Sequence, residues 1–271
     1  MSDGPGARSC ALLGLVVAVV VAAVAASCAG GGRGDAASTS ASNGAPAVTG
    51  TVVVFAASSL TDVFTQIADE VERAHPGVDV QVNAGSSSAL AQQIVDGAPA
   101  AVFASADRAA MDRIGSRGVA PSAFATNELA IAVPTGNPAG VTDLAAFGDP
   151  ARRTGLCAST APCGRYARQS LERAGITPVP VTEEPDVRSL LAKVASGDLD
   201  AGIVYVTDVR AASTTVDAVP VDGDDQVRAQ YLIAPTRPPD GGRPIAAAIV
   251  FVDWVLGPGR PTLRAAGFGV P

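Results

Sequence analysis

From residue 51 to the C-terminus, short apolar runs alternate with longer segments in which apolar residues recur every three or four positions. Short apolar runs indicate buried strands, and the spacing of three or four indicates amphipathic helices. Strands that alternate with helices are typical of a largely parallel sheet with helices on both faces. The pattern therefore predicts an α/β fold.

The clearest unit is the strand "TVVVFAA" at 51–57, followed by a helix in which Ser59 and Asp62 are placed as a capping box. Pro162 is well placed to open a later helix. We expect further strands at 78–84, 100–106, 128–134, 155–159, 201–209 and 226–235. We expect further helices near 90–95 and at 108–118, 163–175, 186–198, 245–257 and 261–269.

Serines gather at two of the predicted strand-to-helix turns, in "AASSL" and "AGSSSAL". Pro162, Cys163 and Gly164 form a third such turn. Free backbone N–H groups and the positive end of the helix dipole meet at a helix N-terminus, and together they attract anions. A serine before a helix is most often a simple N-cap. Three donor-rich turns, however, suit one small ligand held among them.

Net charge and composition narrow the class of ligand. The formal net charge is −7, which argues against nucleic acid, because phosphates require stripes of Lys and Arg. Aromatic residues make up 4% of the chain, so aromatic stacking platforms are not expected. The hydrophobic fraction of 48% is enough for a substantial core.

Residues 1–28 have the features of an export signal: Arg8 precedes an apolar run that ends at "AASC". The segment resembles a bacterial lipoprotein signal with Cys28 as the lipidated residue, although Ala25 stands where a leucine is usual. Ordinary secretion or an uncleaved anchor are the alternatives, and all three export the folded part. Residues 29–50 are rich in Gly, Ala, Ser and Thr, which predicts a flexible tether.

Two further cysteines, Cys157 and Cys163, lie in "CASTAPC" within the exported part. In an oxidising compartment we expect them to form a disulfide. A zinc site would need two more soft ligands, and the single histidine, His75, lies at a predicted helix end. No resident metal or cofactor is expected.

Five stretches, in this order, carry a family resemblance: "VVVFAASSLTDVF", "AGSSSALAQQIVDGAPAAVFASAD", "APCGRYARQSL", "EEPDVRSLLAKV" and "AGIVYVTDV". They resemble the molybdate-binding component of bacterial ABC importers, a type II periplasmic binding protein, over residues 51–271. The resemblance implies two α/β lobes with an oxyanion in the cleft between them. Lobe I would comprise 51–126 and 231–271, and lobe II would comprise 127–230.

The resemblance also implies which residues bind the anion. Ser59 matches the family's serine in the first turn, and Ser87 matches the serine in the second, with Ser86 as the alternative. Both serines would donate hydroxyl and backbone hydrogen bonds. Ser58 is a secondary candidate beside Ser59.

The remaining predicted ligands belong to the second lobe. Cys163 and Val187 would each donate a backbone N–H, and Tyr205 would donate its phenol O–H. Without the resemblance, Tyr205 would be interpreted as a half-buried aromatic residue at the end of a strand.

Molybdate and tungstate suit such a set, because a fully deprotonated dianion only accepts hydrogen bonds, and hydroxyl and N–H groups supply donors. Phosphate keeps a proton and would want an acceptor in the cleft. Asp62 and Asp107 lie close enough in sequence to the serine turns to be considered for that role. Sulfate differs from molybdate mainly in size, so another tetrahedral oxyanion remains the alternative ligand.

Two other functional classes are alternatives to a binding protein. A serine hydrolase would need a base, yet there is no G-x-S-x-G motif and His75 lies at the far end of the helix that Ser59 would begin. A surface adhesion or scaffolding module would make the serine turns incidental.

We therefore expect a binding protein rather than an enzyme, and we expect a monomer. It would sit on the extracytoplasmic face of the membrane, held by a lipid anchor, and deliver its anion to an ABC transporter permease. Strands near 125–130 and 227–233 would act as a hinge that closes the lobes around the anion.

Overall fold

The computed structural model describes residues 47–271. The predicted signal segment 1–28, including Cys28, and residues 29–46 of the predicted tether lie outside the described residues. Within residues 47–271, no helix has both the length and the apolar character that a membrane span requires.

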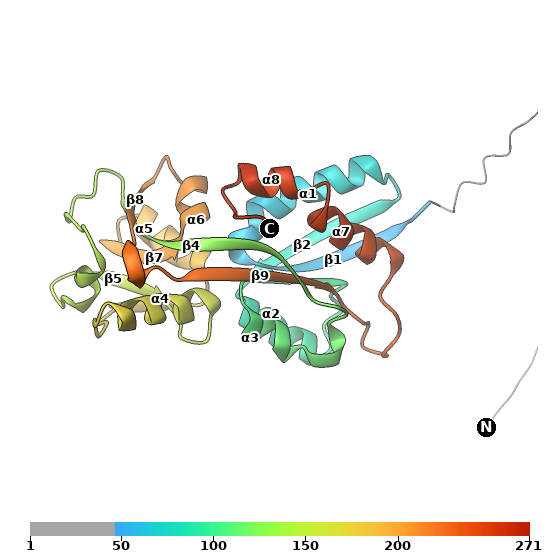
Figure 1. The fold of residues 1–271 in the computed structure, drawn as a ribbon, viewed down its shortest axis with the longest axis horizontal. Helices are drawn as coiled ribbons and strands as arrows, with labels where there is room; N and C mark the ends of the chain where they lie inside the picture. The colour runs from blue at the N-terminus through green and yellow to red at the C-terminus, as the bar shows by residue number, and fades with distance from the viewer. Residues whose placement is uncertain (1–46) are drawn as a thin grey trace, which may run out of the picture. The chain divides into compact units, whose positions relative to one another are not determined.

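The described residues form a sheet with the strand order β2-β1-β3-β9-β4-β7-β5-β6, and β8 pairs with β4 (Figure 1). The strands are β1 (Gly50–Ala57), β2 (Val78–Gly85), β3 (Val102–Ser105), β4 (Ser122–Pro134), β5 (Thr154–Cys157), β6 (Thr182–Glu184), β7 (Ala201–Tyr205), β8 (Val216–Pro220) and β9 (Arg228–Pro235). The helices are α1 (Thr61–Ala74), α2 (Ser87–Val95), α3 (Arg108–Arg113), α4 (Pro162–Arg173), α5 (Val187–Ala195), α6 (Val206–Ala211), α7 (Ala246–Leu256) and α8 (Arg260–Ala265).

Two lobes are built on this sheet. In lobe I, β1 pairs in parallel with β2 and β3, while α1, α7 and α8 lie on one side of the strands and α2 and α3 on the other (Figure 1). In lobe II, β5 pairs in parallel with β6 and β7, and α4, α5 and α6 flank them. The predicted two-lobed α/β fold is confirmed.

Two long antiparallel strands, β4 and β9, run between the lobes (Figure 1). The first half of β4 pairs with β9, and its second half pairs with β7 and β8 in lobe II. The other end of β9 pairs with β3 in lobe I. Each of these strands therefore belongs to both lobes, which is the arrangement that a hinge between them would require.

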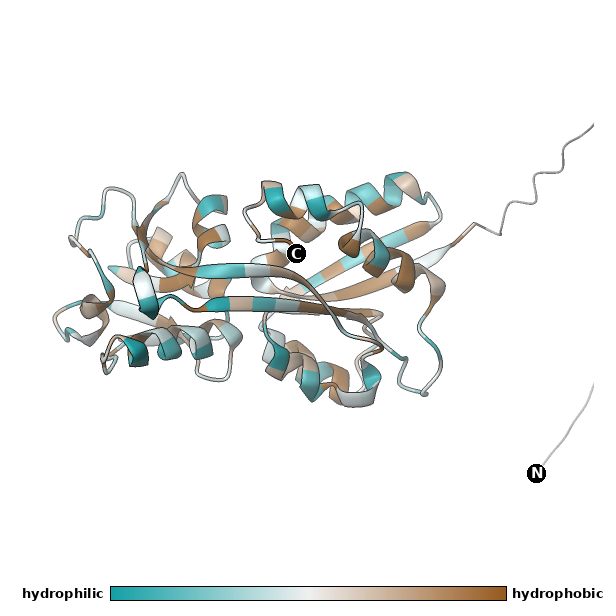
Figure 2. Cartoon of the chain, viewed as in Figure 1, coloured by the Kyte–Doolittle hydropathy of each residue, from teal (hydrophilic) through white to brown (hydrophobic). Residues whose placement is uncertain are grey.

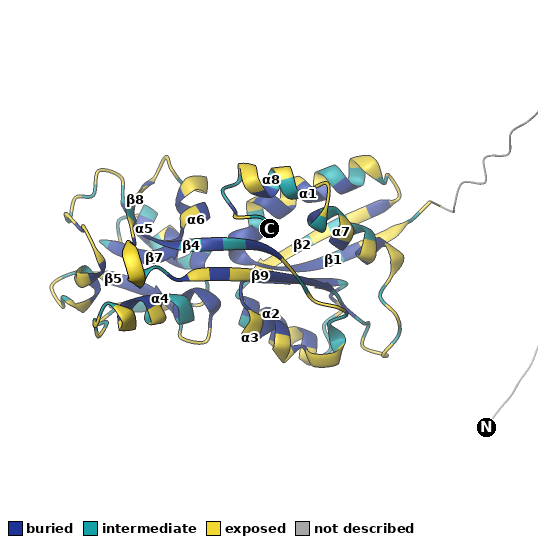
Figure 3. Cartoon of the chain, in the orientation of Figure 1, coloured by how far each residue is buried: buried dark blue, intermediate teal, exposed yellow. Residues whose placement is uncertain are grey.

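The core follows from the hydropathy pattern. The apolar face of α1 is buried through Val63, Phe64, Ile67 and Val71, while its polar face is exposed (Figures 2 and 3). A second buried cluster lies under α2 and α3 on the opposite face of the sheet, around Phe103. Helices on both faces thus bury the central strands, as the alternation of strands and helices predicts.

The structure corrects several sequence expectations. The strand expected at 201–209 ends at Tyr205, where α6 begins, and the short strands β6 and β8 were not anticipated. The capping box at Ser59 is wrong, because α1 begins at Thr61 without a side-chain cap. Pro162 does open α4, as predicted.

Candidate functional site

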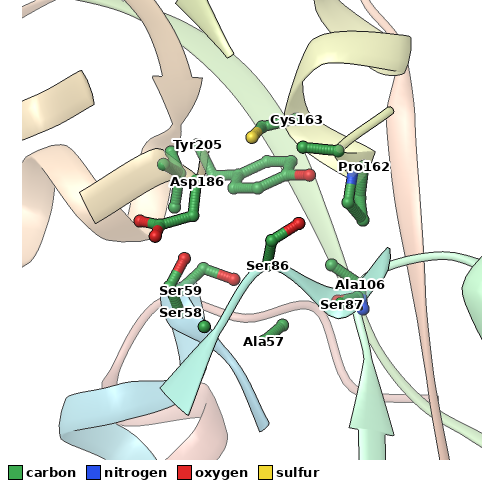
Figure 4. A pocket seen from close by; sticks show the side chains of 13 residues that line it. Ala57, Ser58, Ser59, Ser86, Ser87, Ala106, Pro162, Cys163, Asp186 and Tyr205 are labelled. Atoms are coloured by element: carbon green, nitrogen blue, oxygen red, sulfur yellow. Dashed lines mark hydrogen bonds between the residues drawn. The ribbon is translucent and has the colours of Figure 1, made fainter. Parts of the chain in front are cut away.

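A small pocket lies between the lobes, where the turns after several strands meet (Figure 4). About 210 Å³ of space free of protein atoms lies at this site, and this volume includes space that is open to solvent. Its lining consists of Ala57, Ser58, Ser59, Gly85, Ser86, Ser87, Ala106, Ala161, Pro162, Cys163, Asp186, Val187 and Tyr205. All five principal residues predicted from sequence, and both secondary serines, are in this set.

Ser59 reaches the pocket from the turn that follows β1. Its side chain is buried, and its Oγ lies 2.8 Å from the phenol oxygen of Tyr231 on β9. The Ser59 hydroxyl is therefore hydrogen-bonded to a side chain of β9, one of the two strands that run between the lobes. It does not cap α1.

Ser87 is the first residue of α2, and it is buried. Its Oγ accepts a hydrogen bond from the backbone N–H of Ala106 at 3.1 Å, which leaves the hydroxyl proton free for another acceptor. Ser86 holds the N-cap position of α2, yet its side chain makes no capping bond. Both serines line the pocket, so the choice between them stays a prediction.

Cys163 and Val187 lie in the first turns of α4 and α5, where backbone N–H groups have no acceptor within their own helix. The predicted disulfide between Cys157 and Cys163 is confirmed, with Cα atoms 5.8 Å apart. It ties the start of α4 to the end of β5, and so fixes the turn that carries the Cys163 N–H.

Tyr205 ends β7, and in the view of Figure 4 its ring is drawn between Cys163 and Ser86. The side chain is buried, and its Oη has no hydrogen-bond partner among the described residues. Burial raises the pKa of this phenol well above its ordinary value of 10.0, so the O–H stays protonated at neutral pH. A buried donor without a partner is costly unless a ligand accepts from it.

One charged residue that lines the pocket, Asp186, is not among the site residues predicted from the sequence. Asp186 is the N-cap of α5, and its Oδ1 accepts from the backbone N–H groups of Arg188 and Ser189 at 2.9 and 3.0 Å. The aspartate directly before the helical pattern was the available signal. Asp62 and Asp107, the carboxylates considered from sequence, do not line this pocket.

Those two aspartates instead join the lobes beside the pocket. Asp107 caps α3 and accepts from Arg165 Nε on α4 at 2.9 Å. Asp62 on α1 pairs with Arg188 on α5. The Ser88 hydroxyl donates to the carbonyl of Thr160 at 2.6 Å. The structure therefore has the lobes in contact on both sides of the pocket.

Asp208 lies behind Tyr205 and positions it, because its Oδ2 accepts the Tyr205 backbone N–H at 3.2 Å. Its other oxygen, Oδ1, has no hydrogen-bond partner among the described residues and lies 3.9 Å from Arg188 Nε. Burial raises the pKa of Asp208 from 3.8 to about 7, and Arg188 opposes that rise.

The raised pKa predicts a pH-dependent stability. Between pH 3.8 and about 7, folded Asp208 keeps a proton that the unfolded chain has lost. Its contribution to stability is therefore complete below this window and declines as pH rises through it, by at most about 1.4 kcal/mol per pH unit. Asp208→Asn keeps an acceptor for Tyr205 and removes the titration. In urea unfolding, we expect the free energy of unfolding of the variant to increase relative to that of the wild type as pH rises through this window. A difference between the two proteins that does not change with pH would contradict this expectation.

Comparisons with known proteins agree with this geometry. The sequence matches the family model for "bacterial extracellular solute-binding protein" over residues 52–269. The molybdate-binding protein ModA of Mycobacterium tuberculosis is 37% identical over 224 residues, which cover 82% of this chain and 85% of that protein. The molybdate-binding protein ModA of Escherichia coli is 30% identical, with coverage of 81% and 88%.

A solved structure supports the fold. The periplasmic molybdate-binding protein of Azotobacter vinelandii superposes with a TM-score of 0.67, at 22% identity, over 81% of this chain and 99% of that chain. At this identity the likeness bears on the architecture and not on the ligand.

Proposed function

The chain belongs to the family of bacterial extracellular solute-binding proteins, and from this premise we propose that it captures molybdate in the pocket between its lobes. The 37% identity to a molybdate-binding protein supports this ligand. Tungstate, which has the same charge and tetrahedral shape, would bind in the same pocket.

The single observation that carries the proposal is the buried Tyr205 hydroxyl, which has no hydrogen-bond partner among the described residues. The pocket that it lines also contains the serine hydroxyls and the N-terminal turns of α4 and α5, which are further donors. A dianion that only accepts hydrogen bonds would satisfy these groups together. Ser59, Ser87 and Tyr205 would donate hydroxyl protons, while Cys163 and Val187 would donate backbone N–H groups. Neutral donors hold the anion by oriented dipoles.

A binding role fits the residues better than catalysis. His75 follows the last residue of α1, whereas Ser59 precedes the first, so the 14 residues of the helix, roughly 21 Å, separate them. The His75 ring instead lies edge-on to Trp254. His75 is therefore too far from Ser59 to act as its general base.

Sulfate or phosphate is the alternative ligand. Asp186 is the one carboxylate among the residues that line the pocket. Two backbone N–H groups donate to its Oδ1, and the Ser189 hydroxyl lies 3.4 Å from its Oδ2. A protonated phosphate would need that carboxylate as its acceptor. The other lining groups favour an anion without protons.

We propose that binding closes the lobes about β4 and β9, since the donors come from both sides of the cleft. Lobe I would comprise 51–126 and 231–271, and lobe II would comprise 127–230. The closed form would be delivered to an ABC transporter permease on the extracytoplasmic side. A lipid anchor at Cys28 and a monomeric state complete the proposal, together with the tether predicted over 29–50, which must end before residue 50 because β1 begins at Gly50.

The proposal is tested by calorimetric titration of the purified protein with molybdate, tungstate, sulfate and phosphate. We expect molybdate and tungstate to bind at a stoichiometry of one and far more tightly than sulfate or phosphate. If sulfate or phosphate bound more tightly than molybdate, that anion would be the ligand instead. Heat from none of the four would overturn the proposal.

A further inference from the structure

Behind Ser59, a chain of buried polar side chains runs across both strands that link the lobes. Tyr231 on β9 lies 2.8 Å from Ser59, measured from Oη to Oγ. Asn127 on β4 directs its Nδ2 to Tyr231 Oη at 3.4 Å and to Thr207 Oγ1 at 2.7 Å. The side chains of Tyr231, Asn127 and Thr207 are all buried. None of these three residues lines the pocket.

The direction of the hydrogen bonds along this chain follows from its ends. Asn127 Oδ1 accepts the backbone N–H of Glu128 at 3.0 Å, which places Nδ2 on the side of Tyr231. An amide nitrogen only donates, so the Tyr231 oxygen is the acceptor in that contact. The single phenol proton must then find its own acceptor.

Ser59 Oγ is that acceptor. No other acceptor for the Tyr231 proton lies within hydrogen-bond distance among the described residues. A buried hydroxyl proton without an acceptor would be costly. Ser59 Oγ therefore receives the Tyr231 proton, and its own proton is left to point elsewhere. Since Ser59 lines the pocket, its proton is available to a bound anion.

We propose that Tyr231 is a positioning residue that makes Ser59 a hydrogen-bond donor to the anion, and that Asn127 sets the direction of the Tyr231 hydroxyl. The inference rests on the proposed function, because it requires an anion in the pocket. It assigns a role in recognition to two residues of the strands between the lobes, neither of which lines the pocket.

The packing of Tyr231 allows a clean test. Its ring lies edge-on to Phe124, Tyr205 and Phe268, with centroids 6.1, 6.1 and 5.5 Å away. Tyr231→Phe keeps these contacts and removes only the hydroxyl. Tyr166→Phe is the matched control, because Tyr166 does not line the pocket and makes no side-chain bond to Ser59.

The experiment is a double-mutant cycle by calorimetric titration with molybdate, using the wild type, Tyr231→Phe, Ser59→Ala and the double variant. We expect Tyr231→Phe to weaken binding by about threefold to tenfold, the size of one oriented hydrogen bond. In the Ser59→Ala background, we expect the same change to alter affinity less than twofold. Tyr166→Phe should leave affinity unchanged.

Other outcomes overturn the inference. If Tyr231→Phe binds molybdate as tightly as the wild type or more tightly, Ser59 donates to Tyr231 and not to the anion. If Tyr231→Phe weakens binding equally in both backgrounds, its effect is structural and does not pass through Ser59. If the wild type binds none of the four anions, the proposed function fails first and this inference fails with it.

A second cycle uses Asn127→Asp, which replaces the donating Nδ2 with an accepting oxygen of nearly the same shape. The Tyr231 proton would turn toward the new carboxylate, and Ser59 would have to donate to Tyr231. We expect at least a threefold loss of affinity that is smaller in the Ser59→Ala background. Repulsion between the new charge and the anion acts in both backgrounds, so it cancels in the cycle. Equal losses in both backgrounds would contradict the proposed direction.

Discussion

Replacing Tyr205 with phenylalanine is expected to weaken molybdate binding by about tenfold to a hundredfold, the worth of a hydrogen bond to a charged group. The unliganded protein should be at least as stable as the wild type. Tyr205 Oη has no partner among the described residues, so its removal breaks no hydrogen bond of the fold. Titration calorimetry and thermal unfolding of the same preparations measure the two effects.

Ser87→Ala provides the contrast, because the Ser87 hydroxyl also accepts the Ala106 N–H. This variant should lose affinity and also lose stability, by about 1–3 kcal/mol for a buried donor left unpaired. Unchanged affinity in both Tyr205→Phe and Ser87→Ala would remove these residues from the binding site.

Replacing Gly164 with alanine is expected to destabilise the protein by about 3 kcal/mol and to abolish high-affinity binding. A Cβ at Gly164 would lie 2.0 Å from the carbonyl oxygen of Ala158 and 2.5 Å from that of Cys157. Both atoms are backbone, and the disulfide ties this turn to α4. The turn would have to move, and the neighbouring Cys163 N–H would move with it.

Urea unfolding and molybdate titration of Gly164→Ala test this expectation. Gly85→Ala is the control for stability, because the nearest atom to its new Cβ is a Leu90 side-chain carbon at 3.7 Å, an ordinary contact. If Gly164→Ala unfolded at the wild-type urea concentration, the close packing of this turn would not matter for the fold.

The sequence predicts the architecture well because hydrophobic periodicity is local. The β1–α1 unit shows this, since both its buried strand and the apolar face of α1 can be read from consecutive residues. The end of β7 could not be predicted from local periodicity. The β-branched residues after Tyr205 favour a strand, but Asp208 accepts the Tyr205 N–H and α6 begins there.

The site was only partly predictable. Serines at strand-to-helix turns indicate an anion, but the five-residue set came from the family resemblance. The contacts that join the lobes cannot be inferred from local pattern, because Arg165 and Asp107 are 58 positions apart. The bond between Ser59 and Tyr231 spans 172 positions and depends on how β9 crosses the sheet.

The central claim is that neutral donors from both lobes hold molybdate in one pocket. The most direct test is diffraction at the molybdenum absorption edge from crystals grown with molybdate. We predict one anomalous peak among Ser59, Ser87, Cys163, Val187 and Tyr205, with oxygens within hydrogen-bond distance of the three hydroxyls and two N–H groups. A peak elsewhere, for example in the neighbouring groove lined by Arg188 and Arg210, would contradict the claim.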